Sequence, residues 1–460
     1  MGQRTGGRPA FHVALRKSTI TSMNRRNFWK TMLAAPAVPA AVAQEVAKAT
    51  KGLPPLTIKD VKVISTSGGR RSRWVFLKIV TSEPGLWGIG SANNQYQTYA
   101  VMTALEKHLK PWLIGKDPNR IEDLWQSCNL KTYWRSGPIN NNVVSAMDEA
   151  LWDIKAKRAN MPLYELLGGK AHDGVACYDH VGGRTKEQAA EAVQASLEKG
   201  YRHMRVQYGE GYGGGGFLRP GEGSRPEGGY QGMAFDEELY VDTIPPIFDY
   251  VRSKVGFGPK LLHDVHSHLG GSNAMLFAKR MEPYHLYFVE DLLPPEQVSW
   301  YRKVRQVCAT PQAVGEVFSN PHEYFPLITE QLIDFCRTRV SAIGGITQAK
   351  KIATLCEIFG VKTAWQEGGE NDPVNQMASY HVDISSTAFG IQEENSFPPV
   401  SHEILPGTGE IRKGYLYGSG LPGLGLDINE ELAAKYPLAD IPDGGPYKTD
   451  RGVDGKVIWP

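Results

Sequence analysis

The chain has 460 residues, of which 41% are hydrophobic and 22% charged, and 51 Lys and Arg residues nearly balance 49 Asp and Glu residues. This composition is that of a large soluble globular protein able to bury a sizeable core. A net charge of +2 gives no basic footprint for nucleic acid. No stretch approaches the roughly 20 apolar residues of a membrane-spanning helix. We therefore expect neither a nucleic-acid partner nor a membrane span.

Residues 1–45 are typical of an export signal. A basic segment containing Arg25 and Arg26 precedes an alanine-rich apolar stretch that ends near Ala43. The paired arginines, with the Phe and Lys that follow, resemble a twin-arginine signal, whose cargo is exported already folded. We predict a periplasmic or otherwise exported protein, with residues 1–22 as an over-called start. A basic tail without signal function is the alternative, and the protein would then be cytoplasmic.

The five cysteines are widely spaced and form neither a CxxC pair nor a cluster with zinc-ligand spacing. We expect them to be small buried hydrophobic residues. A protein that folds before export has no need of disulfides.

Residues 56–170 predict an α+β domain. Strands rich in Val and Ile are expected at 57–66 and 74–81, joined by a Gly-Gly turn, and helical patterns follow them.

From about residue 174, short apolar runs alternate with amphipathic helical patterns. Repeated βα units predict a parallel sheet, and seven or eight of them predict a closed (β/α) barrel, here over residues 171–400. An open doubly wound sheet is the alternative, but no Gly-rich dinucleotide turn follows the first strand. The Gly-rich insertion at 209–233 predicts a lid or a disordered loop. Residues 401–460 are rich in Pro and Gly and are expected to wrap back over the first domain.

Three successive barrel strands end in acids, namely Asp264, Glu290 and Glu316, each 26 residues from the next. Carboxyl ends of barrel strands meet at one mouth, so these carboxylates should lie side by side. They would repel one another and raise their own pKa values unless a cation lay between them. Oxygen ligands alone favour one Mg²⁺ rather than zinc. The alternative for each acid is an ordinary ion pair or a helix cap.

His266 lies two residues after Asp264, so on a strand it would point to the same face. This position places an acid or base beside the metal site. His263 and His268 fall on the other parity or past the strand, and we expect them to be structural.

Together these residues resemble the enolase superfamily. The three acids and the segments AMDEALWDIK, PLYELLGG, HDVH, VGEVF, SAIGGIT and FGIQE are most similar to its mannonate dehydratase group, also known as starvation-sensing proteins, over about residues 57–440. The resemblance implies a modified (β/α)7β barrel of the α/β class, capped by both terminal segments. It also implies one Mg²⁺, abstraction of a proton α to a carboxylate, and assembly as a homo-oligomer.

The same resemblance suggests which residues move the proton. The second strand, HMRVQ, lacks the Lys-x-Lys pair of muconate cycloisomerases and dipeptide epimerases. The mannonate dehydratase group instead pairs an Arg of this strand with a Tyr of the following loop. Arg205 matches this Arg, and Tyr212 matches the Tyr, with Tyr208 as the alternative. The adjacent guanidinium should lower the pKa of the tyrosine towards a useful value.

The resemblance also implies a set of substrate contacts, each of which could instead be an ordinary structural residue. They are His180, Arg337, Glu370 and Glu393, with Gln95 from the cap as a weaker match.

Gln366 departs from the family pattern. Dehydratases of this group, like enzymes of the mandelate racemase type, have a His at the end of the seventh strand. The His-Gly-Ala-Thr-Asp run of the dehydratases here reads Gln-Glu-Gly-Gly-Glu. Gln can hydrogen-bond a substrate hydroxyl but cannot transfer a proton. We therefore expect a substrate contact from Gln366 and altered selectivity.

The sequence predicts a Mg²⁺-dependent hydro-lyase that removes water from an aldonic acid such as mannonate or gluconate, giving a 2-keto-3-deoxy sugar acid. Tyr212, assisted by Arg205, would take the α-proton, and His266 would protonate the leaving 3-hydroxyl. The reverse assignment stays open, because stereochemistry decides it. The alternatives are a sugar-acid epimerase or racemase on the same site, and a sugar-acid binding or sensing protein with vestigial catalysis.

Overall fold

The computed structural model describes residues 54–70, 72–131, 133–209, 212–440 and 450–458. Residues 56–460 form one unit, to which the elements below belong. The predicted export signal lies outside the described residues and stays a prediction. Among the described helices, none is both long and apolar enough to cross a membrane.

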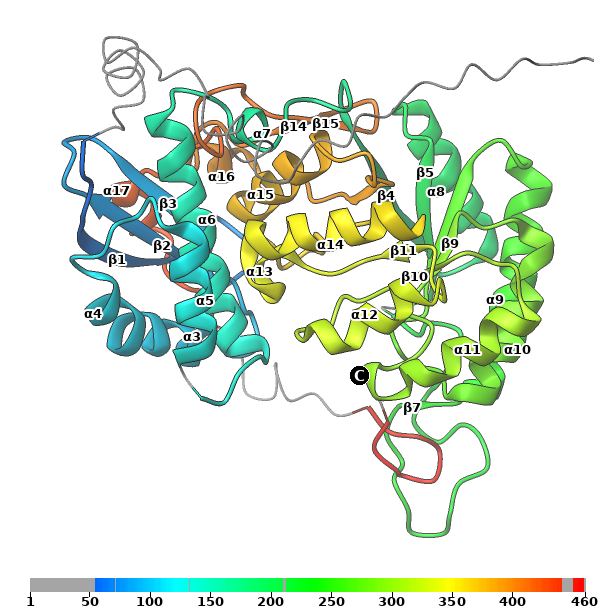
Figure 1. The fold of residues 1–460 in the computed structure, drawn as a ribbon. Coiled ribbons are helices and arrows are strands. Elements are labelled where there is room, and N and C mark those ends of the chain that lie inside the picture. The colour runs from blue at the N-terminus through cyan, green and yellow to red at the C-terminus, as the bar shows by residue number, and fades with distance from the viewer. Residues whose placement is uncertain (1–53, 71, 132, 210–211, 441–449, 459–460) are drawn as a thin grey trace, which may run out of the picture. The chain divides into compact units, whose positions relative to one another are not determined.

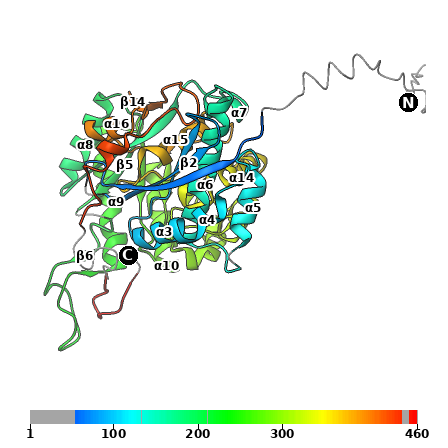
Figure 2. The ribbon, with the colours of Figure 1, turned by 90° about the vertical axis from the view of Figure 1, so that its left-hand side faces the viewer.

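The first part of this unit is the α+β cap. Its antiparallel sheet has the order β1-β2-β3 and consists of β1 (Ile58–Thr66), β2 (Trp74–Thr81) and β3 (Trp87–Ser91). Its helices are α3 (Thr98–Ala104), the π-helix η1 (Leu105–Leu109), α4 (Lys110–Leu113), α5 (Ile121–Lys131), α6 (Pro138–Arg158) and α7 (Leu163–Leu166). Figure 2 shows helices α3 to α6 grouped beside β2.

Helix α6 packs directly on β3, and two glycines make this approach possible. A Cβ atom at Gly88 or Gly90 would overlap the backbone carbonyls of Ala150 and Ala146 in α6. The contact fixes the end of β3 and the loop after it, which runs towards the barrel mouth. Because both positions tolerate only a hydrogen, a side chain at either would push the cap sheet away from α6.

The barrel strands are all parallel to their barrel neighbours. They are β4 (Val175–Gly183), β5 (His203–Tyr208), β8 (Lys260–Asp264), β9 (Phe288–Glu290), β10 (Gln312–Val314), β11 (Phe335–Cys336), β12 (Lys362–Thr363) and β13 (Gln392–Glu393). Strand β13 pairs with β4, and the Glu393 amide donates to the Trp365 carbonyl 3.2 Å away. These contacts join the last strand to both the first and the seventh, so the sheet is closed.

A helix follows each of the first seven barrel strands (Figure 1). These helices are α8 (Lys186–Glu198), α9 (Glu237–Val255), α10 (Gly271–Met281), α11 (Tyr301–Val307), α12 (Pro321–Thr329), α14 (Gly345–Phe359) and α15 (Pro373–Ile384). Shorter helices are η2 (Glu282–Tyr284), η3 (Pro295–Trp300) and α13 (Val340–Ile343). Seven βα units and a final strand confirm the predicted (β/α)7β barrel with its cap.

The last part of the chain contains α16 (Pro399–Ile404), the hairpin β14 (Glu410–Arg412) and β15 (Tyr415–Tyr417), and α17 (Glu430–Ala433). Strand β15 pairs antiparallel with β4. Glu430 of α17 forms ion pairs with Lys62 of β1 at 3.0 Å and with Lys78 of β2 at 2.6 Å. The chain therefore returns from the barrel to the cap sheet.

The Gly-rich insertion after β5 contains a short hairpin, β6 (Phe217–Leu218) and β7 (Ala234–Phe235). Figure 1 shows this segment projecting beyond the barrel helices, beside the C-terminal segment. The two are joined where the Phe235 amide donates to the Arg451 carbonyl at 2.8 Å. The insertion is thus an ordered projection over its described residues.

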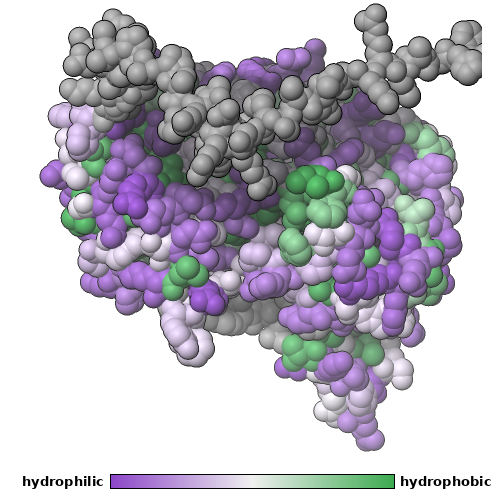
Figure 3. Space-filling model, in the orientation of Figure 1, coloured by the Kyte–Doolittle hydropathy of each residue, from purple (hydrophilic) through white to green (hydrophobic). Residues whose placement is uncertain are grey.

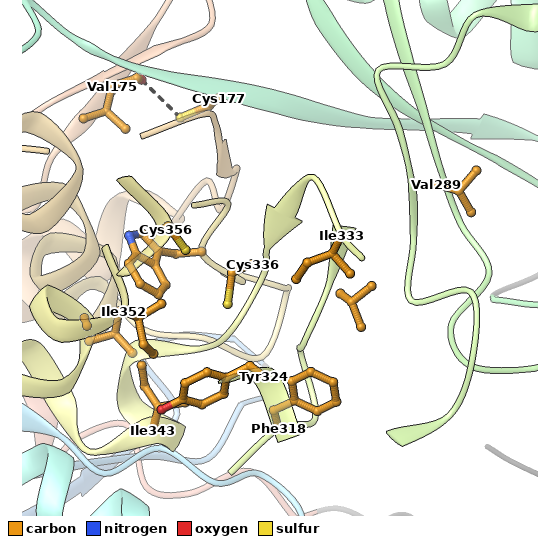
Figure 4. Close-up of a cluster of buried hydrophobic side chains, with 14 of the residues drawn as sticks. Val175, Cys177, Val289, Phe318, Tyr324, Ile333, Cys336, Ile343, Ile352 and Cys356 are labelled. Atoms are coloured by element: carbon orange, nitrogen blue, oxygen red, sulfur yellow. Dashed lines mark hydrogen bonds between the residues drawn. The ribbon is translucent and has the colours of Figure 1, made fainter. Parts of the chain in front are cut away.

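Apolar residues fill the space between the barrel and its helices, whereas hydrophilic residues cover much of the face shown in Figure 3. Figure 4 shows Cys336 of β11 and Cys356 of α14 among Ile333, Ile352 and Tyr324. All five cysteines are buried and free of disulfides, as the sequence predicted.

Candidate active site

Two inward layers of side chains lie at the carboxyl ends of the barrel strands. The lower layer is mostly apolar and consists of Tyr178, Leu262, Phe288, Ala313, Phe335, Ala364 and Ile391. Side chains alternate along a strand, so the residues two positions further on point the same way. Apart from Gly315, which has no side chain, these residues are His180, Asp264, Glu290, Arg337, Gln366 and Glu393. The apolar layer therefore closes the floor of a polar site.

A tight group of buried carboxylates occupies one side of this site. Asp264, Glu290 and Asp291 offer oxygen atoms that all lie within 4.8 Å of one another. Asp264 Oδ2 is buried and accepts no hydrogen bond from the described residues, with Arg205 Nη1 3.4 Å away. An oxygen-only ligand set with an unsatisfied oxygen fits a hard divalent cation such as Mg²⁺.

Burial raises the pKa of Asp264 to about 7, that of Glu290 to about 8 and that of Asp291 to about 7, against opposing effects of the nearby arginines. Neighbouring carboxylates contribute in the same direction as burial. A bound cation would favour the ionised forms and relieve this repulsion.

Glu316 is the third ligand expected from the sequence. It is separated from the group of Asp264, Glu290 and Asp291 by the guanidinium of Arg337, which pairs with both Asp291 and Glu316. Its Oε2 pairs with Arg337 Nη1 at 2.7 Å, and Asp291 Oδ2 is 3.2 Å from the same nitrogen. Burial is the largest single effect and raises the pKa of Glu316, but the neighbouring groups, with the Arg337 charge first among them, together outweigh it and the pKa is lowered. The Glu316 charge nevertheless raises the pKa of Asp264, so the two carboxylates are close enough to interact electrostatically.

Asp291 was not expected in the site, because it follows Glu290 and on a continuing strand would point outward. Strand β9 ends at Glu290, and Asp291 has a φ of +38°. This left-handed turn brings its carboxylate back towards the barrel interior, where Oδ1 accepts from the Gly315 amide at 3.0 Å. The strand pattern of the sequence does not indicate this left-handed turn, so it does not predict that Asp291 faces inward.

Arg205 of β5 connects the carboxylates to the proton-transfer candidates. Its Nη1 donates to Glu290 Oε1 at 2.8 Å and to Glu393 Oε1 at 2.9 Å. Its Nη2 donates to the Tyr212 hydroxyl at 2.9 Å. Tyr212 is therefore the loop tyrosine that contacts Arg205.

His266 stacks on Tyr212, with ring centroids 4.2 Å apart and planes 12° from parallel. Its position differs from the one predicted, because β8 ends at Asp264 and His266 has a φ of +53°. The histidine reaches the site from a left-handed turn held by its own amide, which donates to Asp264 Oδ1 at 2.7 Å. His266 is therefore in the site, as expected, but it is placed there by a turn and not by the alternation of side chains along a strand.

The pKa of Tyr212 departs from the sequence prediction. Arg205 lowers it as expected, but burial acts more strongly and raises the pKa above the ordinary tyrosine value. In this state the phenol holds its proton and can donate it. The sequence could not weigh burial of the ring against the charge beside it.

The predicted substrate contacts line the remaining walls. His180 Nε2 is 3.0 Å from Glu393 Oε1, and Arg337 Nη2 pairs with the other oxygen of Glu393 at 2.5 Å. Gln366 is 2% exposed, and its Oε1 has no hydrogen-bond donor among the described residues. Arg339, which the sequence analysis missed, donates to Glu370 Oε1 at 2.8 Å.

The cap reaches the barrel mouth through Asn93. The Asn93 side chain donates to the Glu370 carbonyl at 2.6 Å. Gln95 is half-buried two residues further on, and its carbonyl lies 3.3 Å from the Thr98 hydroxyl. A substrate contact from Gln95 stays a prediction.

Tyr178 was also missed, although its side chain lies in the floor of the site. Its hydroxyl donates to Glu290 Oε2 at 3.2 Å and accepts from Arg337 Nε at 3.3 Å. It is fully buried, so it links a candidate metal ligand to a candidate substrate contact in a fixed position. An inward tyrosine on a barrel strand is indistinguishable from a core residue in the sequence alone.

Known families match both parts of this architecture. Residues 47–168 match the mandelate racemase / muconate lactonizing enzyme N-terminal domain, and residues 187–432 match the enolase C-terminal domain-like family. The capped barrel with acids at its strand ends is thus a member of the enolase superfamily.

Individual relatives define the family more closely. A D-galactonate dehydratase family member of Paenibacillus sp. (strain JDR-2) is 47% identical over 396 residues, which are 85% of this chain and 97% of the relative. The family member RspA of Pantoea ananatis is 44% identical over 88% of this chain and 99% of its own length. The chain belongs to the D-galactonate dehydratase family, a dehydratase family within the enolase superfamily, and so to the hydro-lyases.

A solved structure supports the same placement. The crystal structure of an enolase from Pantoea ananatis with bound D-gluconate and Mg is 44% identical and superposes with a TM-score of 0.84. The match covers 88% of this chain and all of that one. The sugar acid and the metal are properties of that protein, and they bear on this chain only through the proposal below.

Proposed function

We propose that the protein is a Mg²⁺-dependent dehydratase of an aldonic acid, of the mannonate or gluconate type, that forms a 2-keto-3-deoxy sugar acid. The observation that carries the proposal is the stacked pair of Tyr212 and His266 beside buried carboxylates, with Arg205 on the tyrosine hydroxyl. The Pantoea structure with D-gluconate and Mg lends further support.

Asp264, Glu290 and a third carboxylate would hold the ion. Five carboxylates (Asp264, Glu290, Asp291, Glu316, Glu393) surround two guanidinium groups (Arg205, Arg337), an excess of negative charge that a divalent cation offsets. When bound, Mg²⁺ would bind the substrate carboxylate and stabilise the negative charge that develops as the α-proton leaves.

The chain's own residues would carry out both proton transfers. The C2–H bond breaks as the proton passes to a base, and the C3–O bond breaks as an acid protonates the hydroxyl, which leaves as water. The resulting enol then takes a proton at C3 to give the 2-keto acid. Tyr212 and His266 lie on the same side of the site, which favours removal of the proton and the hydroxyl from one face of the substrate.

The raised pKa of Tyr212 supports a change from the roles first expected. A tyrosine that holds its proton suits the acid that protonates the 3-hydroxyl, so His266 would take the α-proton. The assignment first expected, with Tyr212 as the base and His266 as the acid, is the alternative.

Gln366 bears on selectivity within the family. Its buried, unpaired Oε1 can accept a hydrogen bond from a substrate hydroxyl. Because Gln366 replaces a family histidine, we place the chain in the mannonate dehydratase group by its motifs but expect a different preferred sugar acid. The predicted export signal would place the reaction outside the cytoplasm.

A sugar-acid library incubated with Mg²⁺ in deuterated water tests the proposal. Semicarbazide detects a 2-keto product, and NMR detects deuterium at C2, with Glu290→Gln as the inactive control. Product with at least one acid is the expected result. Deuterium at C2 without product would indicate an epimerase, and neither signal with any acid would indicate a binding or sensing protein. Full turnover by Glu290→Gln would refute the metal site.

A further inference from the structure

Cap strand β3 ends at Ser91, and the hydroxyl of this buried residue connects the cap to the barrel. Ser91 Oγ donates to Asp372 Oδ2 at 2.6 Å. Asp372 is the N-cap of α15, because its other oxygen accepts from the amides of Val374 at 2.9 Å and Asn375 at 3.1 Å. One hydrogen bond thus joins the last residue of a cap strand to the first turn of a barrel helix.

The same hydroxyl fixes the base of the cap loop, residues 92–97, which follows β3. It accepts from the Asn93 amide at 3.3 Å, and the Ser91 amide donates to Glu149 Oε2 of α6 at 2.7 Å. The cap loop also contains Gln95, the substrate contact that the sequence predicts in the cap. The position of this loop therefore depends on Ser91.

The wall loop, residues 367–371, ends at Asp372 and forms one wall of the barrel mouth. Within it, Glu370 Oε1 accepts from Arg339 Nη1 at 2.8 Å. The Asn93 side chain of the cap loop donates to the Glu370 carbonyl at 2.6 Å. The cap loop and the wall loop are therefore held against each other by this contact and by the one from Ser91.

This network places several carboxylates in the interior. Burial raises the pKa of Glu149 and of Asp372 above their ordinary values. It also raises the pKa of Glu367, which accepts from Asn375 Nδ2 at 2.7 Å, to about 8. Buried ionisable groups often contribute no more stability than apolar side chains of the same size would. The position that the network imposes on the two loops therefore explains it better than stability does.

We propose that Ser91 is a positioning residue that keeps the cap loop closed on the wall loop and so sets the affinity for the sugar acid. The candidate metal ligand Glu290 and the proton-transfer candidate Tyr212 are held by Arg205 instead. Loss of the Ser91 hydroxyl should therefore weaken substrate binding and leave the proton transfers largely intact. The effect on kinetics rests on the proposed dehydratase function, whereas the effect on loop position does not.

Two variants remove the same hydrogen bond from opposite ends. Ser91→Ala deletes the donor, and Asp372→Ser deletes the acceptor but keeps a residue type that caps helices well. Without the bond the loop is closed for only part of the time, and the apparent affinity falls in proportion. With a sugar acid that is turned over, each variant should raise KM by about 10–100-fold and lower kcat by no more than about threefold.

The double variant Ser91→Ala/Asp372→Ser tests whether the two residues act through one bond. It should be no worse than either single variant, because both remove the same interaction. Losses that add in the double variant, or a fall in kcat at unchanged KM, would overturn the proposal.

Thr347→Val is the matched structural control. Thr347 is buried near the start of α14, and its hydroxyl accepts from Trp152 Nε1 of α6 at 2.9 Å. The variant therefore also removes a polar contact between cap and barrel, but not one made by the cap loop. It should lower the midpoint of urea unfolding about as Ser91→Ala does and leave KM unchanged. An equal rise of KM in both variants would show general loosening of the cap and contradict a specific role for Ser91.

Hydrogen exchange gives a measurement that needs no turnover. Mass spectrometry should show faster exchange over residues 92–97 in Ser91→Ala than in the wild type, because the Asn93 amide loses its acceptor. Exchange in α14 should not change. Equal exchange over residues 92–97 in the two proteins would overturn the proposal even for an active enzyme. If no sugar acid is turned over, the proposed function fails, and this measurement alone decides the role of Ser91.

Discussion

Tyr212 and His266 lie face to face with ring centroids 4.2 Å apart, and Arg205 donates to the tyrosine hydroxyl at 2.9 Å. Two groups able to transfer protons are thus held side by side, and one of them, the tyrosine hydroxyl, already accepts a hydrogen bond from a guanidinium group. Such a pair can serve the two neighbouring carbons of a β-elimination without a large movement of the substrate.

The two residues should be separable by experiment. With His266 as the base, His266→Asn should lose both deuterium exchange at C2 and dehydration. Tyr212→Phe should lose dehydration by roughly 10²–10⁴-fold but retain exchange, because only the acid is missing. NMR in deuterated buffer measures exchange and product together.

Tyr208→Phe is the matched control, since Tyr208 ends β5 and is the other tyrosine that the sequence offered. It should behave nearly as the wild type. Loss of exchange in Tyr212→Phe with exchange kept in His266→Asn would show that the roles are the reverse.

The third metal ligand is open to direct measurement. We expect Glu316→Gln to weaken Mn²⁺ or Mg²⁺ binding by about 10–100-fold in calorimetry. Glu316 is 23% exposed towards the mouth and pairs with one guanidinium, so an ion can draw it in. Asp291 is held by both Arg337 and the Gly315 amide and should be the poorer ligand.

Asp291→Asn is the comparison variant in this experiment. It should bind the ion within a few-fold of the wild type but unfold more easily, because Arg337 loses a buried partner. If Asp291→Asn abolishes ion binding while Glu316→Gln leaves it intact, the tight group Asp264, Glu290 and Asp291 is itself the metal site.

The sequence predicted correctly those features that depend on the order of the strands and on which residues end them. Repeated βα units predicted the barrel, and an acid at the end of a strand is visible because strand ends lie together in this fold. Asp264 and Glu290 were found in this way and lie where they were expected. The cap was predicted in the same way, from strands followed by helices.

The sequence was uninformative where the backbone leaves regular structure or where distant parts meet. Asp291 and His266 enter the site through left-handed turns that no strand period describes. Asn93 contacts Glu370 because of how the cap packs on the barrel mouth, and no motif in the sequence indicates this contact. The raised pKa of Tyr212 depends on burial, a property of the whole fold.

Gln366 offers a test of selectivity. Gln366→His should add a titrating limb near pH 6.5 to the pH profile of kcat/KM and change the preferred sugar acid, because an imidazole can transfer a proton and an amide cannot. The buried position accepts a side chain of similar size. Gln366→Ala removes the hydrogen bond without adding a titrating group, so it should lower activity and add no limb. An unchanged profile in Gln366→His would contradict a contact between this side chain and the substrate.

His381 of α15 should make stability depend on pH. It is buried, its Nδ1 accepts from the Tyr164 amide at 3.2 Å, and burial lowers its pKa to about 4. In the unfolded chain its pKa is about 6.5, so below that pH unfolding takes up a proton that the folded state excludes. Its contribution to stability is therefore complete above pH 6.5 and is lost as the pH falls towards 4, at up to about 1.4 kcal/mol per pH unit.

Urea unfolding at pH 7.5, 6 and 5 measures this loss for the wild type and for His381→Gln. The variant should lose less stability between pH 6.5 and 5, because it has no imidazole to protonate on unfolding. His203, which burial likewise gives a pKa of about 4, still contributes in both proteins, so the slope should be reduced rather than abolished. Exposed His322→Gln is the control for loss of an imidazole as such. Equal slopes in the wild type and His381→Gln would mean that His381 is protonated in the folded protein.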